Sequence, residues 1–291
     1  MDNTLVRNLI DAGIHFGHRS SRWNPKMAPY IFGKRRLIHI IDIKETLKGL
    51  LYARKFLSQV VGDGKDVLFV GTKRQARKVV ETVAADTGMH YVNDRWLGGT
   101  LTNFRTIRSR LGRMTELETL TEGEKAATFS KKQLSAYRRE LRKIKRNLEG
   151  IRNMERLPGA IVLVDQRREI NAVKEARKLG IPTVCLLDTD CDPDLVDIAI
   201  PGNDDAMRAI ELVFAELGAA VKEGKAGRVD RGEGPGARGQ RRRSQRPAMG
   251  RAEGEAEAAE PAAEPAPGAE PAAPPVAEPP AQAPGESAGP A

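Results

Sequence analysis

Cysteine and aromatic residues are scarce in this sequence of 291 residues, which contains two Cys, two Trp and four Tyr. The chain has no apolar segment at its start of the kind found in signal peptides, and no apolar run long enough to cross a bilayer. These absences predict a reduced, cytoplasmic protein with no membrane partner. A disulfide between Cys185 and Cys191 is the weaker alternative, because cytosolic thiols stay reduced.

Catalytic and nucleotide-binding motifs are also missing. The chain has no GxSxG, HExxH or paired CxxC, and no P-loop or dinucleotide fingerprint follows any predicted strand. Its four histidines stand in no recognisable catalytic spacing. We therefore expect no enzymatic activity, no cofactor and no small-molecule substrate. A sugar-phosphate enzyme on a doubly wound sheet is the alternative from the enzyme class.

Positive charge is in excess and unevenly placed. Lys and Arg number 48 against 39 Asp and Glu, a formal net charge of +9. Residues 1–221 hold 38 basic and 28 acidic side chains, whereas residues 252–291 hold eight Glu and no Lys or Arg. The part of the chain expected to fold is therefore basic without its tail, which favours a polyanionic partner.

Short apolar runs alternate with amphipathic stretches between Arg36 and Asn203. This pattern is typical of a parallel sheet covered by helices and predicts an α/β, doubly wound, mostly parallel sheet. The predicted strands are Leu37–Ile41, Val67–Val70, His90–Val92, Ala160–Val164, Thr183–Leu187 and Ile198–Ile200, and the predicted helices include Ile43–Val61, Gln75–Thr87, Glu169–Leu179 and Ala206–Lys222.

The segment from Phe104 to Glu155 breaks the alternation, because it contains no strand pattern. Its apolar residues recur every three or four positions on either side of Gly123, which predicts an antiparallel coiled-coil hairpin of two helices. Between Arg105 and Arg156 the chain has 15 basic and 7 acidic residues. The outward faces of the hairpin could hold a nucleic acid, or they could be only a solvated surface.

Signals of ordered structure end after Gly224. Gly, Arg and Ser dominate to Arg251, and Ala, Glu and Pro repeat beyond it. Such a composition cannot bury enough apolar surface to offset the entropy of ordering, so we expect a disordered tail. The predicted domains are a discontinuous α/β core of residues 1–104 and 157–226, a coiled-coil hairpin insertion at 105–156 and a tail at 227–291.

The stretch from Ala12 to Arg36 mixes His, Trp, Tyr and Phe with Lys and Arg along a path interrupted by Gly and Pro. Basic side chains bind phosphates and aromatic planes stack on unpaired bases, so this composition favours RNA. A zinc site at His15 and His18 is a weaker alternative, because the only acidic residue nearby in sequence is Asp11.

Two further motifs lie where strands end. In VGTKRQAR, from Val70 to Arg77, Lys73, Arg74 and Arg77 either contact a nucleic-acid backbone or solvate the start of a helix. The acidic run from Asp188 to Asp197 is not an EF-hand, because it has Pro where the loop needs Gly and is followed by Ala where Glu is needed. A looser magnesium site is an alternative to a set of turns and helix caps.

Three long blocks together resemble the bacterial small-subunit ribosomal protein S-two family. They are Ala12–Asp42, Val70–Arg77 with Asp94–Ile107, and Leu157–Ile210. The residues that match the family's motifs are His15, Gly17, His18, Trp23, Asn24, Pro25 and Lys26 in the first block, Arg95 to Asn103 in the second and Pro201 to Asp205 in the third.

This resemblance implies a flavodoxin-like sheet with a protruding coiled-coil arm, assembly on 16S ribosomal RNA, and no catalysis. It also implies that ribosomal protein S-one, which recruits messenger RNA, is a neighbour. Asp190 and Ala209 depart from the usual Asn and Ser of the family, so the resemblance implies no role for those two side chains. The tail lies outside the resemblance.

We expect the hairpin and the loops beside it to contact RNA mainly through phosphates, with stacking added near Trp23. An RNA-binding or coiled-coil adaptor outside the ribosome is the alternative, and no metal site is expected. The candidate RNA-binding residues are His18, Arg19, Trp23, Lys26, Lys73, Arg74, Arg95, Arg105, Arg108, Arg138 and Arg142.

Overall fold

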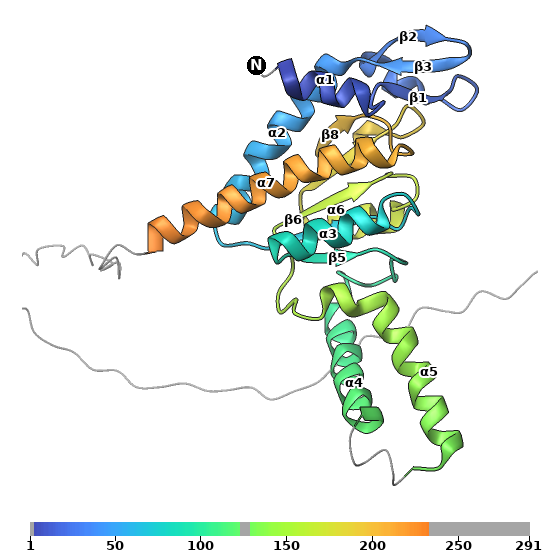
Figure 1. The fold of residues 1–291 in the computed structure, drawn as a ribbon, viewed down its shortest axis with the longest axis vertical. Helices are drawn as coiled ribbons and strands as arrows, with labels where there is room; N and C mark the ends of the chain where they lie inside the picture. The colour runs from blue at the N-terminus through green and yellow to red at the C-terminus, as the bar shows by residue number, and fades with distance from the viewer. Residues whose placement is uncertain (1–2, 123–128, 233–291) are drawn as a thin grey trace, which may run out of the picture. The chain divides into compact units, whose positions relative to one another are not determined.

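The computed structural model describes residues 3–122 and 129–232 of the chain (Figure 1). The predicted tail lies outside the described residues from residue 233 onward. The last helix, α7, spans Met207–Gly232 and so continues past both its predicted end at Lys222 and the predicted start of the tail at Gly227. None of the described helices is long and apolar enough to span a membrane.

Five parallel strands form the central sheet in the order β5-β4-β6-β7-β8. All five were predicted from the alternation of apolar runs. Successive side chains of each strand point to opposite faces, so an apolar run such as that of β6 is buried on both sides. The strands are β4 (Val67–Val70), β5 (His90–Val92), β6 (Ala160–Val164), β7 (Thr183–Leu187) and β8 (Ile198–Pro201).

Helices cover both faces of this sheet. On one face α2 (Ile43–Gly62), α3 (Arg77–Thr87) and α7 pack over a core that includes Phe69 and Phe214. On the other face α6 (Ile170–Leu179) packs with the helical hairpin over a second core. The loops after the neighbouring strands β4 and β6 therefore lead to helices on different faces.

Three further strands form a separate antiparallel sheet in the order β1-β3-β2. They are β1 (Phe16–Arg19), β2 (Ile31–Arg35) and β3 (Ile38–Ile41), preceded by helix α1 (Asn3–Asp11). The prediction that Leu37–Ile41 belongs to the parallel sheet is wrong. Arg36 and Leu37 adopt φ angles of +48° and +65°, which turn the chain back at once so that β3 pairs with β2.

The segment between the second and third strands of the parallel sheet forms two antiparallel helices, α4 (Phe104–Glu122) and α5 (Lys131–Leu148). None of its described residues contributes a strand. Ser130 begins α5 with a capping box to Gln133. Apolar residues of α4, such as Met114 and Leu117, are fully buried, and a short 3₁₀ turn, Glu149–Ile151, follows α5.

Candidate functional site

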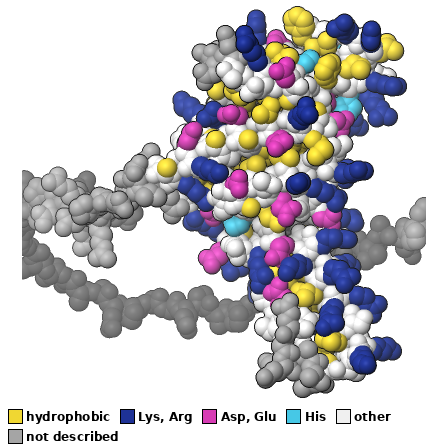
Figure 2. All heavy atoms as spheres, viewed as in Figure 1, with side chains coloured by type: hydrophobic (Ala, Val, Ile, Leu, Met, Phe, Trp, Pro, Cys, Tyr) yellow, Lys and Arg dark blue, Asp and Glu magenta, His cyan; other side chains and the backbone are white. Residues whose placement is uncertain are grey.

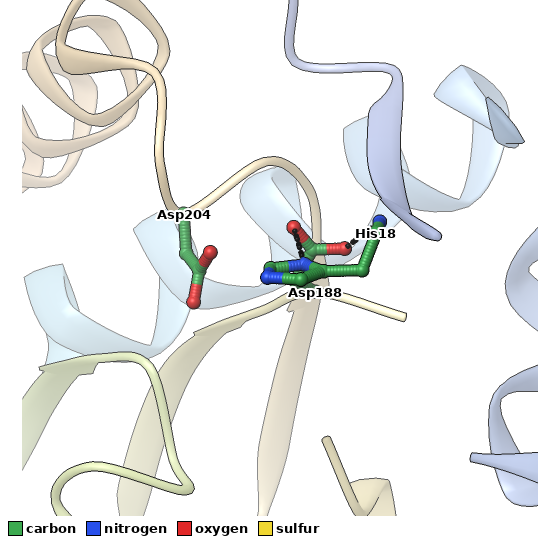
Figure 3. A group of neighbouring side chains, drawn as sticks. All are labelled: His18, Asp188 and Asp204. Atoms are coloured by element: carbon green, nitrogen blue, oxygen red, sulfur yellow. Dashed lines mark hydrogen bonds and ion pairs between the residues drawn. The ribbon is translucent and has the colours of Figure 1, made fainter. Parts of the chain in front are cut away.

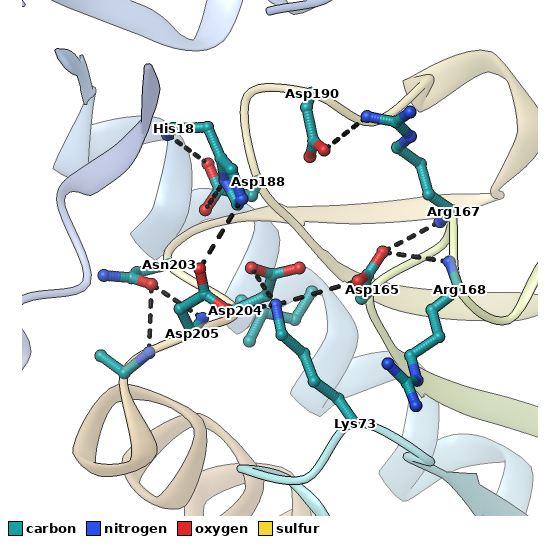
Figure 4. A network of polar contacts seen from close by, with 12 residues as sticks. His18, Lys73, Asp165, Arg167, Arg168, Asp188, Asp190, Asn203, Asp204 and Asp205 are labelled. Atoms are coloured by element: carbon teal, nitrogen blue, oxygen red, sulfur yellow. Dashed lines mark hydrogen bonds and ion pairs between the residues drawn. The ribbon is translucent and has the colours of Figure 1, made fainter. Parts of the chain in front are cut away.

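Polar side chains from five segments meet at the carboxyl edge of the parallel sheet (Figure 4). Parallel strands all end at the same edge, so the residues that follow them lie together although they are far apart in sequence. Lys73 follows β4, Asp165 follows β6, Asp188 follows β7, Asp204 and Asp205 follow β8, and His18 reaches them from β1.

His18 and Asp188 connect the small sheet to the large one. The imidazole Nδ1 lies 2.8 Å from Oδ2 of Asp188, and the backbone N–H of His18 donates to Oδ1 of the same carboxylate (Figure 3). The contact with Asp188 raises the pKa of His18 to about 9. Gly17 makes this approach possible, because a Cβ there would lie only 2.6 Å from Cγ2 of Thr189.

Lys73 lies among three carboxylates. Its Nζ is 2.8 Å from Oδ1 of Asp204, 2.6 Å from Oδ1 of Asp205 and 3.8 Å from Oδ2 of Asp165. Burial and the neighbouring Asp188 charge raise the pKa of Asp204 to about 7, although Lys73 opposes the shift. The Lys73 side chain is only 12% exposed, so its positive charge is used within the protein, where it pairs with these carboxylates.

His18, Asp188 and Asp204 also form a group that could hold a divalent cation. One ligand atom from each lies within 4.8 Å of the others. This is a different set from the zinc alternative considered for the sequence, because the partners of His18 are carboxylates some 170 residues away and not His15. The His15 ring instead contacts that of Phe16 at a tilt of 39°, with ring centroids 4.1 Å apart.

The acidic loop does not gather its carboxylates around one point. Asp190 pairs with Arg167 at 2.7 Å, and the carboxylate of Asp197 accepts from the backbone and hydroxyl of Thr183. Asp192 caps the short 3₁₀ turn Pro193–Leu195. The five carboxylates of this loop therefore do not share one site, and of them only Asp188 joins the cluster, while the looser magnesium alternative stays untested.

Four other candidate residues come from the first two blocks, namely Arg19, Trp23, Lys26 and Arg74. Lys26 contacts Asp192 at 2.8 Å and Asp194 at 2.7 Å, and the Trp23 ring lies against His39 at a tilt of 35°, with ring centroids 5.2 Å apart. Arg19 and Arg74 are exposed. Trp23 is 38% exposed, so one part of its ring is available to a partner.

The candidate arginines of the hairpin are exposed, namely Arg105 and Arg108 on α4 and Arg138 and Arg142 on α5. Arg108 donates to the backbone oxygen of Glu155, and Arg138 and Arg142 line a shallow cleft of about 360 Å³. Figure 2 shows Lys and Arg side chains gathered along one side of the molecule, from the small sheet down to α5. The candidate arginines are thus exposed on the two helices of the hairpin, in other elements than the cluster of His18 and Lys73.

Both cysteines are free, as expected from the sequence. They are buried, and burial raises the pKa of each thiol. A reactive thiolate is therefore not part of this site.

Comparisons with known proteins identify relatives over most of the chain. The family model described as Ribosomal protein S2 matches residues 9–224. The small ribosomal subunit protein uS2 of Rhodopirellula baltica is 58% identical over 225 residues, which cover 77% of this chain and 86% of that protein. The uS2 of Syntrophobacter fumaroxidans is 50% identical over 76% of this chain and 80% of its own length. The uS2c of Guillardia theta is 51% identical over 76% of this chain and 94% of its own length.

Proposed function

The chain belongs to the ribosomal protein S2 family, and we propose that it binds 16S ribosomal RNA as a structural component of the small ribosomal subunit. The family's proteins are structural parts of the ribosome that act in translation, and the chain is accordingly not an enzyme. Ribosomal RNA and other ribosomal proteins are the partners that this membership implies.

The observation that carries the RNA proposal is the row of basic side chains in Figure 2. A polyanion binds such a surface by releasing counterions, and Arg engages phosphate oxygens in pairs. We propose that the exposed residues contact the RNA, while His18 and Lys73 position the loops around them. The proposed contacts are Arg19, Trp23, Lys26, Arg74, Arg95, Arg105, Arg108, Arg138 and Arg142.

We assign the parallel sheet to the flavodoxin-like, doubly wound class. Counted along the chain, its strand order is 2-1-3-4-5, which is the order of that class, and helices cover both faces. We also propose that α4 and α5 form a coiled-coil insertion at residues 105–156 in a core of residues 1–104 and 157–226. In this proposal the insertion supplies RNA contacts that the sheet alone does not.

A protein neighbour is part of the same proposal. Phe32 on β2 and Leu37 in the turn between β2 and β3 are 78% and 68% exposed, and large apolar side chains with this exposure suit a protein contact. We propose ribosomal protein S-one as the neighbour that the chain helps to dock, in a cytoplasmic ribosome. Binding of purified S-one to 30S particles that carry the Phe32→Ala variant tests this part separately.

The main test is whether the full chain becomes a stoichiometric part of 30S particles. Tagged protein expressed in a bacterial cell should sediment with 30S particles after a high-salt wash and co-purify with 16S RNA in a one-to-one ratio. A matched variant in which Arg105, Arg108, Arg138 and Arg142 are all Gln should be washed off at lower salt. Protein that stays at the top of the gradient would support the alternative of an RNA-binding adaptor outside the ribosome.

A further inference from the structure

A concave site lined by other residues than the carboxylate cluster lies at the carboxyl edge of the parallel sheet. It is a pocket of about 440 Å³ between the ends of β4, β5 and β6. The loop after β4 leads to α3 on one face of the sheet, and the loop after β6 leads to α6 on the opposite face. The two loops therefore diverge. Doubly wound sheets form ligand crevices at the point where two such loops diverge.

Four arginines from four separate segments line this pocket, and two acidic residues lie among them. Asp94 is shared, because Oδ1 accepts from Arg77 at 2.9 Å and Oδ2 from Nε of Arg146 at 2.8 Å. Glu169 is 1% exposed and accepts from the backbone N–H of Thr72. Positive charge is thus in excess in the pocket. The four arginines are Arg77, Arg95, Arg146 and Arg168.

The positive charge of two of these arginines is available to a ligand. In the described part of the chain, no carboxylate lies within ion-pair distance of Arg95 or Arg168. Arg168 uses only Nε, which donates to the hydroxyl of Thr72 at 2.9 Å, and this bond aims the rest of its guanidinium. The planar guanidinium of Arg168 is thus held at Nε, and its two terminal nitrogens are left for a ligand. Such a guanidinium suits a phosphate group, which it can engage with two parallel hydrogen bonds.

We propose that this pocket binds the phosphate of a ribonucleotide, with Arg95 and Arg168 as its direct contacts. Its volume lies within the range of about 300–1,000 Å³ that is typical of small-molecule sites. The phosphate can belong to the backbone of an RNA nucleotide or to a free nucleoside monophosphate. The proposal that the phosphate belongs to RNA rests on the proposed function. The proposal that the pocket binds a phosphate group does not, because it is argued from the pocket residues alone.

The test uses the full chain and three ligands, namely uridine, uridine 5′-monophosphate and a short oligouridylate. Titration calorimetry should show the monophosphate binding at least about tenfold tighter than uridine, since a charge-assisted hydrogen bond is worth about one decade or more of affinity. Arg95→Gln and Arg168→Gln should each weaken binding by about tenfold. Arg208→Gln, an exposed arginine of α7 outside the pocket, is the matched control and should change binding less than about twofold.

The two sources give different orders of affinity. An oligouridylate that binds tighter than the monophosphate, and loses affinity in the same two variants, identifies the RNA backbone. A monophosphate that binds at least as tightly as the oligonucleotide identifies the free nucleotide. Either order supports a phosphate pocket.

Three results would overturn the pocket: equal affinity for uridine and its monophosphate, no binding of either phosphate ligand at millimolar concentration, or unchanged binding in both variants. Arg95 makes no ion pair in the described structure, so its variant tests the pocket even where Arg168→Gln lowers stability. Wild-type protein that fails to co-purify with 16S RNA would contradict the proposed function instead. If the pocket does not bind phosphate, the protein should still co-purify with 16S RNA.

Discussion

The indole Nε1 of Trp96 donates a 3.0 Å hydrogen bond to Oε1 of Glu175, a residue of α6. The same carboxylate accepts from the backbone N–H groups of Gly99, Leu101 and Thr102. Burial would raise the pKa of Glu175, but these hydrogen bonds outweigh it and the pKa is lowered. One charged side chain thus fixes the whole loop that leads from β5 into the helical hairpin.

Replacing Glu175 with Gln should therefore destabilise the protein by about 2–4 kcal/mol. The amide keeps the shape but offers one acceptor oxygen and no charge, and charged hydrogen bonds contribute about 1.5–3 kcal/mol each. Urea unfolding of the full chain measures the change. Glu211→Gln on α7 is the control, because Glu211 is exposed, and a loss of equal size there would contradict the role of Glu175.

The pH dependence of stability should reveal the ion pair of His18 and Asp188. The folded pKa of His18 is raised above its usual 6.5 to about 9, so its contribution is complete below pH 6.5 and is lost as pH rises through 9. In buffer with a chelator, the free energy of unfolding should fall by about 2 kcal/mol between pH 7.5 and 9.5, because one pKa unit corresponds to ~1.4 kcal/mol. His18→Gln should remove most of this fall, and an unchanged slope in the variant would show that another group titrates.

The parallel strands were predictable because each is a short apolar run bounded by polar loops, as in Ala160–Val164. The small antiparallel sheet was not, since its turn uses Arg36 and Leu37 with positive φ. Asn and Gly are the residues that usually indicate a turn with positive φ, and neither stands at these two positions. Local sequence therefore gave no reason to separate β3 from the parallel sheet.

The sequence marks candidate residues where they stand in a dense basic or aromatic segment, as at Trp23 and Lys26, and their role in RNA binding stays a prediction. The link between His18 and Asp188 spans 170 positions and depends on the sheet's topology, so no spacing along the chain announces it. Lys73 shows the converse. Its sequence neighbours suggest a phosphate contact, but folding brings three carboxylates around its ammonium group.

A divalent cation should stabilise the protein through His18, Asp188 and Asp204. One imidazole nitrogen and two carboxylate oxygens suit zinc, which accepts N and O ligands at about 2.0–2.2 Å. Zinc at a hundred times its dissociation constant should add about 2.7 kcal/mol to the free energy of unfolding, and a chelator should reverse the gain. His18→Gln should abolish the effect while His90→Gln on β5 keeps it. Equal stabilisation of both variants would place the cation elsewhere.

The last prediction concerns how exposed arginines of the hairpin bind RNA. Arg138 and Arg142 on α5 are exposed and have no ion-pair partner in the described part of the chain, whereas Arg113 on α4 contacts Glu116 and Glu140. Phosphate contacts position a protein without reading sequence, so Arg138→Gln and Arg142→Gln should weaken binding to a 16S fragment and to an unrelated duplex alike.

Each of these two changes should also lower the salt slope of RNA binding by about 1, because one fewer phosphate is neutralised. Arg113→Gln is the matched control and should alter the slope less, since its charge is already paired within the protein. Filter binding of the single variants at several salt concentrations measures both quantities. If Arg138→Gln and Arg142→Gln bind both RNAs with the wild-type affinity and slope, the hairpin is a protein-contact element, and the basic face of α5 is only a solvated surface.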